Sequence, residues 1–164
     1  MKPANMLLPR GTSAGDVAKI GTAESATSAH LKVHLVDFGL ARRWREPQTG
    51  EHVLPVRRRG VVGTGRFASL SNHCGEPLGR RDDLEALGFT LAFLRGGRLP
   101  WSGLMAPSKA ERFALMLESK RNASLEEIGA DLPPAFTDYL HAVRELQYDE
   151  SPKYAVLERL LSSM

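Results

Sequence analysis

The spacing of apolar residues predicts helices in the second half of the chain. Residues 82–94, DDLEALGFTLAFL, are apolar almost all round, which is typical of a helix buried at the centre of a domain. Helical patterns recur at residues 108–120, 133–146 and 152–161. A proline stands near the start of the last two, where its missing N–H is not needed. The pattern therefore predicts a mainly helical body.

The first half has a different pattern. The apolar segments Met6–Leu8 and Leu31–Val36 predict two short strands, the second with alternating apolar and polar residues. Between them, residues 9–30 are rich in Gly, Ala, Ser and Thr and are interpreted as a flexible insertion. Residues 40–81 hold many Arg, Gly and Pro without a sustained period, which favours a long irregular surface segment. The predicted fold class is mainly α with a short β-hairpin (α+β).

Composition narrows the classes of function. The chain of 164 residues is 42% hydrophobic, and its net charge of +3 is too small to argue for nucleic acid or a membrane surface as a partner. The longest apolar run, residues 86–94, is well short of the roughly 20 residues of a membrane span. The single cysteine, Cys74, excludes an internal disulfide and favours an intracellular location, in the cytoplasm, the nucleus or both. The five histidines have no paired spacing for zinc.

The tripeptide Asp37-Phe38-Gly39 directly follows the second predicted strand. A phosphoryl-transfer enzyme needs a carboxylate at such a place to hold Mg²⁺ on the nucleotide phosphates. Alone, the tripeptide is equally a strand-ending turn. The upstream sequence Lys2-Pro3-Ala4-Asn5 changes this balance, because it matches the Lys-Pro-x-Asn end of a kinase catalytic loop. Its other interpretation is a simple polar turn.

With these motifs in place, three further segments resemble the casein kinase 1 family of protein serine/threonine kinases. They are VHLVDFGLARRWREPQTGEHV, VGTGRFASLSNH and GRRDDLEALGFTLAFLRGGRLPWSGL, in that order. Ala68-Ser69-Leu70-Ser71 is similar to the family's own replacement for the Ala-Pro-Glu of most kinases. The resemblance covers roughly residues 1–8 and 31–161. It implies an incomplete protein-kinase-like C-terminal lobe.

The resemblance also implies roles for individual residues. Asp37 and Asn5 would bind Mg²⁺, Lys2 would contact the transferred phosphoryl group of ATP, and Gly63-Thr64 would shape the loop that receives the substrate. Asp83 corresponds to a buried aspartate that accepts backbone N–H bonds from the catalytic loop. A helix N-cap carboxylate is its other interpretation, and the two are compatible.

Family members favour protein substrates that are acidic or already phosphorylated, which they bind in an anion pocket. Here its residues would be Arg66, Gly103 and Arg112. Arginine suits this role because its planar guanidinium bonds two oxygens at once and stays charged. The alternative is that the two arginines are separate, solvated surface charges. The arginine runs at 42–45 and 57–59 add positive charge to the same part of the chain.

The sequence departs from the family pattern at its start. The family's catalytic base is an aspartate two residues before Lys2, and the glycine-rich loop and the strand lysine also have no counterpart in the 164 residues. We therefore expect a partial kinase domain divided at residues 1–8, 9–30, 31–81 and 82–164. Three interpretations stay open: part of an ATP- and Mg²⁺-dependent kinase, a non-catalytic module that binds phosphorylated or acidic peptides, and a truncated gene product. Alone, the chain would be inactive, and either unstable or dependent on a partner that covers the missing lobe.

Overall fold

The computed structural model describes residues 1–8 and 33–164. The expected insertion at 9–30 therefore lies entirely outside the described residues. The described chain divides into two compact units. The described residues of the smaller one are 3–8 and 33–41, and the larger one is formed by residues 1–2 and 42–164. Within the described residues, the fold is mainly helical with one two-stranded antiparallel sheet, as the sequence predicts.

The smaller unit contains the sheet. A 3₁₀ turn, η1 (Pro3–Asn5), leads into β1 (Met6–Leu7), which pairs antiparallel with β2 (His34–Leu35). The backbone N–H of Val36 donates to the carbonyl oxygen of Asn5 at 3.0 Å, so the pairing continues one residue beyond the strand. This pairing places the end of β2 beside η1.

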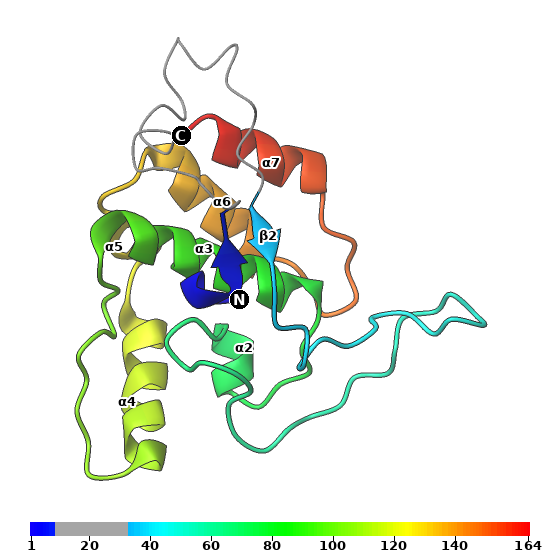
Figure 1. The fold of residues 1–164 in the computed structure, drawn as a ribbon, viewed down its shortest axis with the longest axis horizontal. Helices are drawn as coiled ribbons and strands as arrows, with labels where there is room; N and C mark the ends of the chain where they lie inside the picture. The colour runs from blue at the N-terminus through cyan, green and yellow to red at the C-terminus, as the bar shows by residue number, and fades with distance from the viewer. Residues whose placement is uncertain (9–32) are drawn as a thin grey trace. The chain divides into compact units, whose positions relative to one another are not determined.

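The larger unit is built around α3 (Arg80–Gly96) and α6 (Pro134–Arg144), which pack against each other (Figure 1). The other helices are α2 (Leu70–His73), α4 (Lys109–Asn122), α5 (Leu125–Ile128) and α7 (Tyr154–Ser162). Helices α5 and α7 pack on α6, whereas α2 packs against both α3 and α4. The fully buried centre is aromatic and aliphatic: Phe89, Trp101, Phe136, Tyr139 and Leu140.

The caps explain where several helices begin. The side chains of Ser69, Ser108 and Ser124 each accept a backbone N–H three residues later, at the N-termini of α2, α4 and α5. Pro134 occupies the first turn of α6, where no N–H is needed. The predicted helices at 108–120, 133–146 and 152–161 are therefore confirmed within a few residues at each end.

Two expectations need correction. Helix α3 is not buried all round, because Leu94 is 57% exposed while Phe89 is fully buried. Apolar content alone does not determine how many neighbours cover a helix. The segment 40–81 is not wholly irregular, because it contains α2 and an isolated antiparallel bridge between Arg45 and His52.

In the described part of the chain, none of the helices is both long and apolar enough to cross a membrane.

Candidate functional site

Asn5 and Asp37 lie side by side in the smaller unit. The Asn5 side-chain amide donates to a carboxylate oxygen of Asp37 at 3.4 Å. Asp37 has a φ of +65°, and it is the only residue other than glycine with a positive φ in the described segments. A residue in this region costs roughly 1–3 kcal/mol, and such strain concentrates at functional sites. The expected pair is thus brought together, with its aspartate in an unfavourable backbone conformation.

The chemistry of this pair fits Mg²⁺. A half-turn of the Asn5 amide would place its oxygen beside Asp37, which gives the hard oxygen ligands that Mg²⁺ prefers. The described residues contain no group of three or more His, Cys, Asp or Glu side chains that could hold a metal alone. Mg²⁺ is usually held by one or two carboxylates together with phosphate and water. The two side chains would therefore need phosphate or water oxygens to complete the coordination of a metal ion.

The substrate-receiving loop predicted from the sequence is a tight turn in the larger unit, and we call residues 63–68 the Arg66 segment. Gly63 has a φ of +81°, which favours glycine, and Gly63 and Thr64 are both exposed. The Thr64 carbonyl oxygen accepts the backbone N–H groups of Phe67 and Ala68 at 3.0 and 3.1 Å. The turn therefore presents its first residues to solvent and buries its last ones.

Arg66 is half-buried, and its guanidinium lies over the Phe93 ring of α3, 5.2 Å from the ring centre. This cation–π contact restricts the motion of the side chain but does not use the N–H donors of the guanidinium. The indole N–H of Trp101 donates to the Arg66 carbonyl oxygen at 2.7 Å. The backbone and the side chain of Arg66 are therefore both held by the helical body.

Gly103 and Arg112 are exposed residues on segments that adjoin the Arg66 segment. Gly103 follows Trp101 by two residues and has a φ of +76°. Next to Arg112, the Phe113 ring packs so closely on Gly65 that a Cβ there would lie 2.7 Å from the ring. The three predicted anion-binding residues thus come from adjoining segments.

Asp82 and Asp83 differ in burial. Asp82 is buried, accepts the Gly79 backbone N–H at 2.7 Å and accepts the Ser69 hydroxyl. Burial raises the pKa of Asp82, against the opposing effect of the Ser69 hydroxyl. Asp83 is exposed, so the burial expected for it is wrong in the described structure, and the N-terminal capping belongs to its neighbour. Its contact with the catalytic loop stays a prediction.

A buried ion pair joins α3 and α6 beneath this region. Glu85 is 6% exposed, and one of its oxygens accepts from the Arg144 guanidinium at 2.9 Å. The other oxygen accepts the Leu70 backbone N–H at 3.0 Å, at the start of α2. The sequence pattern did not single out this pair. It ties the helix that follows the Arg66 segment to the helical core.

Lys120 is the residue that sequence reasoning missed most clearly. Its side chain is fully buried and donates to the carbonyl oxygens of Gly65 and Ala68. Burial lowers the pKa of its ammonium to about 7, although Glu85 acts in the opposite direction. Lysine in a helical pattern usually indicates a solvated face, so the sequence carries no signal for this role.

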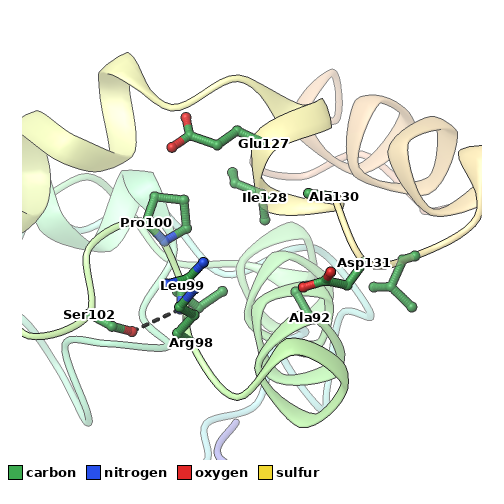
Figure 2. A pocket seen from close by; sticks show the side chains of 10 residues that line it. Ala92, Arg98, Leu99, Pro100, Ser102, Glu127, Ile128, Ala130 and Asp131 are labelled. Atoms are coloured by element: carbon green, nitrogen blue, oxygen red, sulfur yellow. Dashed lines mark hydrogen bonds between the residues drawn. The ribbon is translucent and has the colours of Figure 1, made fainter.

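A separate pocket of about 410 Å³ lies between the C-terminal end of α3 and α5 (Figure 2). Its walls include Arg98, Glu127 and Asp131, and the Ser102 hydroxyl accepts the Leu99 N–H at 2.8 Å beside it. None of the residues predicted for metal or anion binding lines it. The pocket is distinct from the candidate site. Lys2 belongs to the larger unit, and its contact with phosphate stays a prediction.

Comparison with known proteins finds similar sequences. No family model matches the chain. The chain is 35% identical over all of its length to casein kinase I homolog 2 of Schizosaccharomyces pombe, and spans 34% of that protein. It is 37% identical over 80% of its length to casein kinase I homolog 1 of Saccharomyces cerevisiae, and spans 24% of it.

A third relative is the probable casein kinase I homolog of Encephalitozoon cuniculi, at 41% identity over 80% of this chain and 43% of that protein. The chain therefore spans between about a quarter and somewhat under half of the length of these relatives. Its mainly helical fold, with one short antiparallel sheet, agrees with a C-terminal kinase lobe. The 164 residues are therefore similar to a segment of the longer casein kinase I homologues.

Proposed function

We propose that this chain is the substrate-binding part of a protein serine/threonine kinase that transfers the γ-phosphoryl group of ATP to acidic or already phosphorylated proteins. The observation that carries the proposal is the Asn5–Asp37 pair, whose aspartate has a φ of +65° directly after β2. The similarity to casein kinase I homologues supports the same reaction class.

In this proposal, Asn5 and Asp37 would hold Mg²⁺ through oxygen atoms, and the metal would neutralise charge on the nucleotide phosphates. Lys2 would add a positive charge near the transferred group. The positive φ of Asp37 costs energy whether or not a nucleotide is bound, so the carboxylate is oriented in advance. This orientation favours a catalytic role for Asp37 over that of an ordinary turn residue.

Substrate choice would depend on the anion site formed by Arg66, Gly103 and Arg112. Phe93 restrains the Arg66 guanidinium, and Phe113, the residue next to Arg112, packs against Gly65. Both contacts support two arginines that reach one phosphate from different segments. Each charge-assisted hydrogen bond would contribute roughly 1.5–3 kcal/mol, and less where solvent screens it.

The test is calorimetric titration with a serine peptide that is phosphorylated upstream of its target hydroxyl, and with its unphosphorylated twin. We expect preferential binding of the phosphopeptide, weakened about tenfold or more by Arg66→Ala and by Arg112→Ala. The control replaces the neighbouring arginines at 57–59 with glutamine, which removes diffuse charge but leaves the site. Equal affinity for the two peptides would reject the anion site. So would a preference that disappears only in the control.

A non-catalytic binding module is the second candidate. All three anion-site residues belong to the larger unit, whereas Asn5 and Asp37 belong to the smaller one. Phosphopeptide recognition therefore requires none of the metal-binding residues. The test places this chain in a complete homologue, where it replaces the matching segment. If the chain binds phosphopeptide but the exchange protein supports no phosphoryl transfer, the chain is such a module.

A further inference from the structure

The backbone of the Arg66 segment is held by buried side chains of the helical body. Lys120, in α4, donates to the Gly65 carbonyl oxygen at 3.1 Å and to the Ala68 carbonyl oxygen. Trp101 donates its indole N–H to the Arg66 carbonyl oxygen at 2.7 Å. Lys120 and Trp101 are both 0% exposed. The ring Nε2 of His73 also lies 2.9 Å from the Gly65 carbonyl oxygen. Lys120 and Trp101 together contact three of the four carbonyl groups from Gly65 to Ala68, and Lys120 is the side chain that joins Gly65 to Ala68.

The surroundings of Lys120 indicate that filling space is not its main role. Its ammonium lies 4.7 Å from the centre of the Trp101 ring and 4.9 Å from that of the Phe89 ring. Among the described residues, no carboxylate is within salt-bridge distance of it. An unpaired buried charge is costly, and methionine would fill a similar volume without that cost. What lysine adds is a set of N–H donors aimed at the two carbonyl groups.

The two carbonyl groups that Lys120 binds stand on either side of Arg66. The Gly65 carbonyl group belongs to the peptide plane that precedes Arg66, so a shift of this group would move the Arg66 guanidinium relative to the Phe93 ring. The Ala68 carbonyl group anchors the segment two residues after Arg66. Trp101 fixes the peptide plane between them, and Gly103 follows two residues later in the same loop. The same contacts therefore determine where Arg66 lies and connect it to a second part of the anion site.

We propose that Lys120 and Trp101 are positioning residues that hold the Arg66 segment in the conformation required for phosphate recognition. This inference rests on the anion site proposed above. Neither residue contacts the phosphate, because both are buried below the segment. Their contribution is to restrict the backbone, so that Arg66 loses less conformational freedom when it binds.

The experiment compares phosphopeptide and unphosphorylated twin by calorimetry for the parent chain, Lys120→Met, Lys120→Arg and Trp101→Phe. Lys120→Met keeps the length of the side chain but removes its donors, and Lys120→Arg restores donors in a similar volume. Trp101→Phe keeps an aromatic ring without the N–H. Lys153→Met is the matched control, because it removes the same charge from an exposed residue at the start of α7. Far-ultraviolet circular dichroism establishes that each variant is folded.

We expect the phosphopeptide preference to fall about tenfold in Lys120→Met, to fall in Trp101→Phe, and to return at least in part in Lys120→Arg. Lys153→Met should match the parent. The double variant Lys120→Met/Arg66→Ala should bind no more weakly than Arg66→Ala alone, because both changes act through the same guanidinium. General loosening of the fold would instead weaken the double variant further.

Three outcomes would overturn the inference. The first is a folded Lys120→Met that keeps the full phosphopeptide preference, and the second is additive loss in the double variant. If Lys120→Met does not fold, Trp101→Phe decides, and an unchanged preference in that variant is the third. A parent chain without phosphopeptide preference would reject the anion site itself, whereas a preference that only Arg66→Ala removes would reject Lys120 and Trp101 alone.

Discussion

Replacement of Lys120 by methionine should change how the stability of the protein depends on pH. The ammonium is 0% exposed, and burial lowers its pKa from the ordinary 10.5 to about 7. In the unfolded chain the same group regains its ordinary pKa. Between these two values, the unfolded state therefore binds more protons than the folded state.

The sign of the effect follows from this difference. Stability rises with pH wherever the unfolded state binds more protons. Below about pH 7 both states carry the charge, and the folded state bears the full cost of burying it. As the pH rises from 7 to 9, the folded state loses the proton and that cost is relieved. Integration over this range gives a gain of about 2 kcal/mol in the free energy of unfolding.

The measurement is urea unfolding of the parent chain and of Lys120→Met at pH 7, 8 and 9, at constant ionic strength. For a urea dependence of about 2 kcal/mol per molar, the unfolding midpoint of the parent should rise by about 1 M relative to the variant. Ionisable groups that the two proteins share contribute equally to both, so their contributions cancel in the comparison. Parallel midpoints from pH 7 to 9 would refute the reasoning, because they would mean that Lys120 has an ordinary pKa.

Two further predictions concern the backbone and the ion pair of the larger unit. Gly75→Ala should lower the free energy of unfolding, measured in urea, more than Gly97→Ala does. Both glycines have a positive φ, but only a Cβ at Gly75 would meet another backbone atom, the Arg58 carbonyl oxygen at 2.6 Å. Similar losses of stability of about 1 kcal/mol for both variants would contradict this prediction. Arg144→Met should cost about 3–5 kcal/mol of stability at pH 7, because it leaves the Glu85 carboxylate buried and without its cation, whereas His141→Gln at an exposed pair should leave the unfolding midpoint unchanged. A loss below 1 kcal/mol in Arg144→Met would show that Glu85 is not held in the buried pair.

The sequence predicted the long helices because they carry signals that depend only on nearby residues. Ser108 is the N-cap of α4, and Pro134 stands in the first turn of α6. Apolar residues recur at helical spacing within these helices. Helices α2 and α5 have only four residues each, which is too short for a periodic pattern. Their formation depends on serine caps and on packing against neighbours that are distant in the sequence.

The candidate site could be predicted only in part. The motif around Asp37 follows a strand in the sequence, and its neighbour Asn5 belongs to a recognisable motif, so both could be named before the structure was known. The choice between Asp82 and Asp83 could not be made in that way. Adjacent residues of a helix point in different directions, and the tertiary contact with Ser69 determines which one is buried. The burial of Lys120 likewise depends on a loop more than fifty residues earlier.

The most direct test of the central claim is a segment exchange. Residues 1–164 would replace the aligned segment of casein kinase I homolog 2 of Schizosaccharomyces pombe, which matches the chain over its whole length. Phosphoryl transfer from Mg-ATP to a phosphorylated peptide and to its unphosphorylated twin would then be measured. The account predicts that the exchange protein phosphorylates the phosphorylated peptide in preference to its twin. Asp37→Asn should abolish the transfer, and Arg66→Ala should remove the preference for the phosphorylated peptide. A folded, phosphopeptide-binding exchange protein without transfer, or transfer that survives Asp37→Asn, would contradict it.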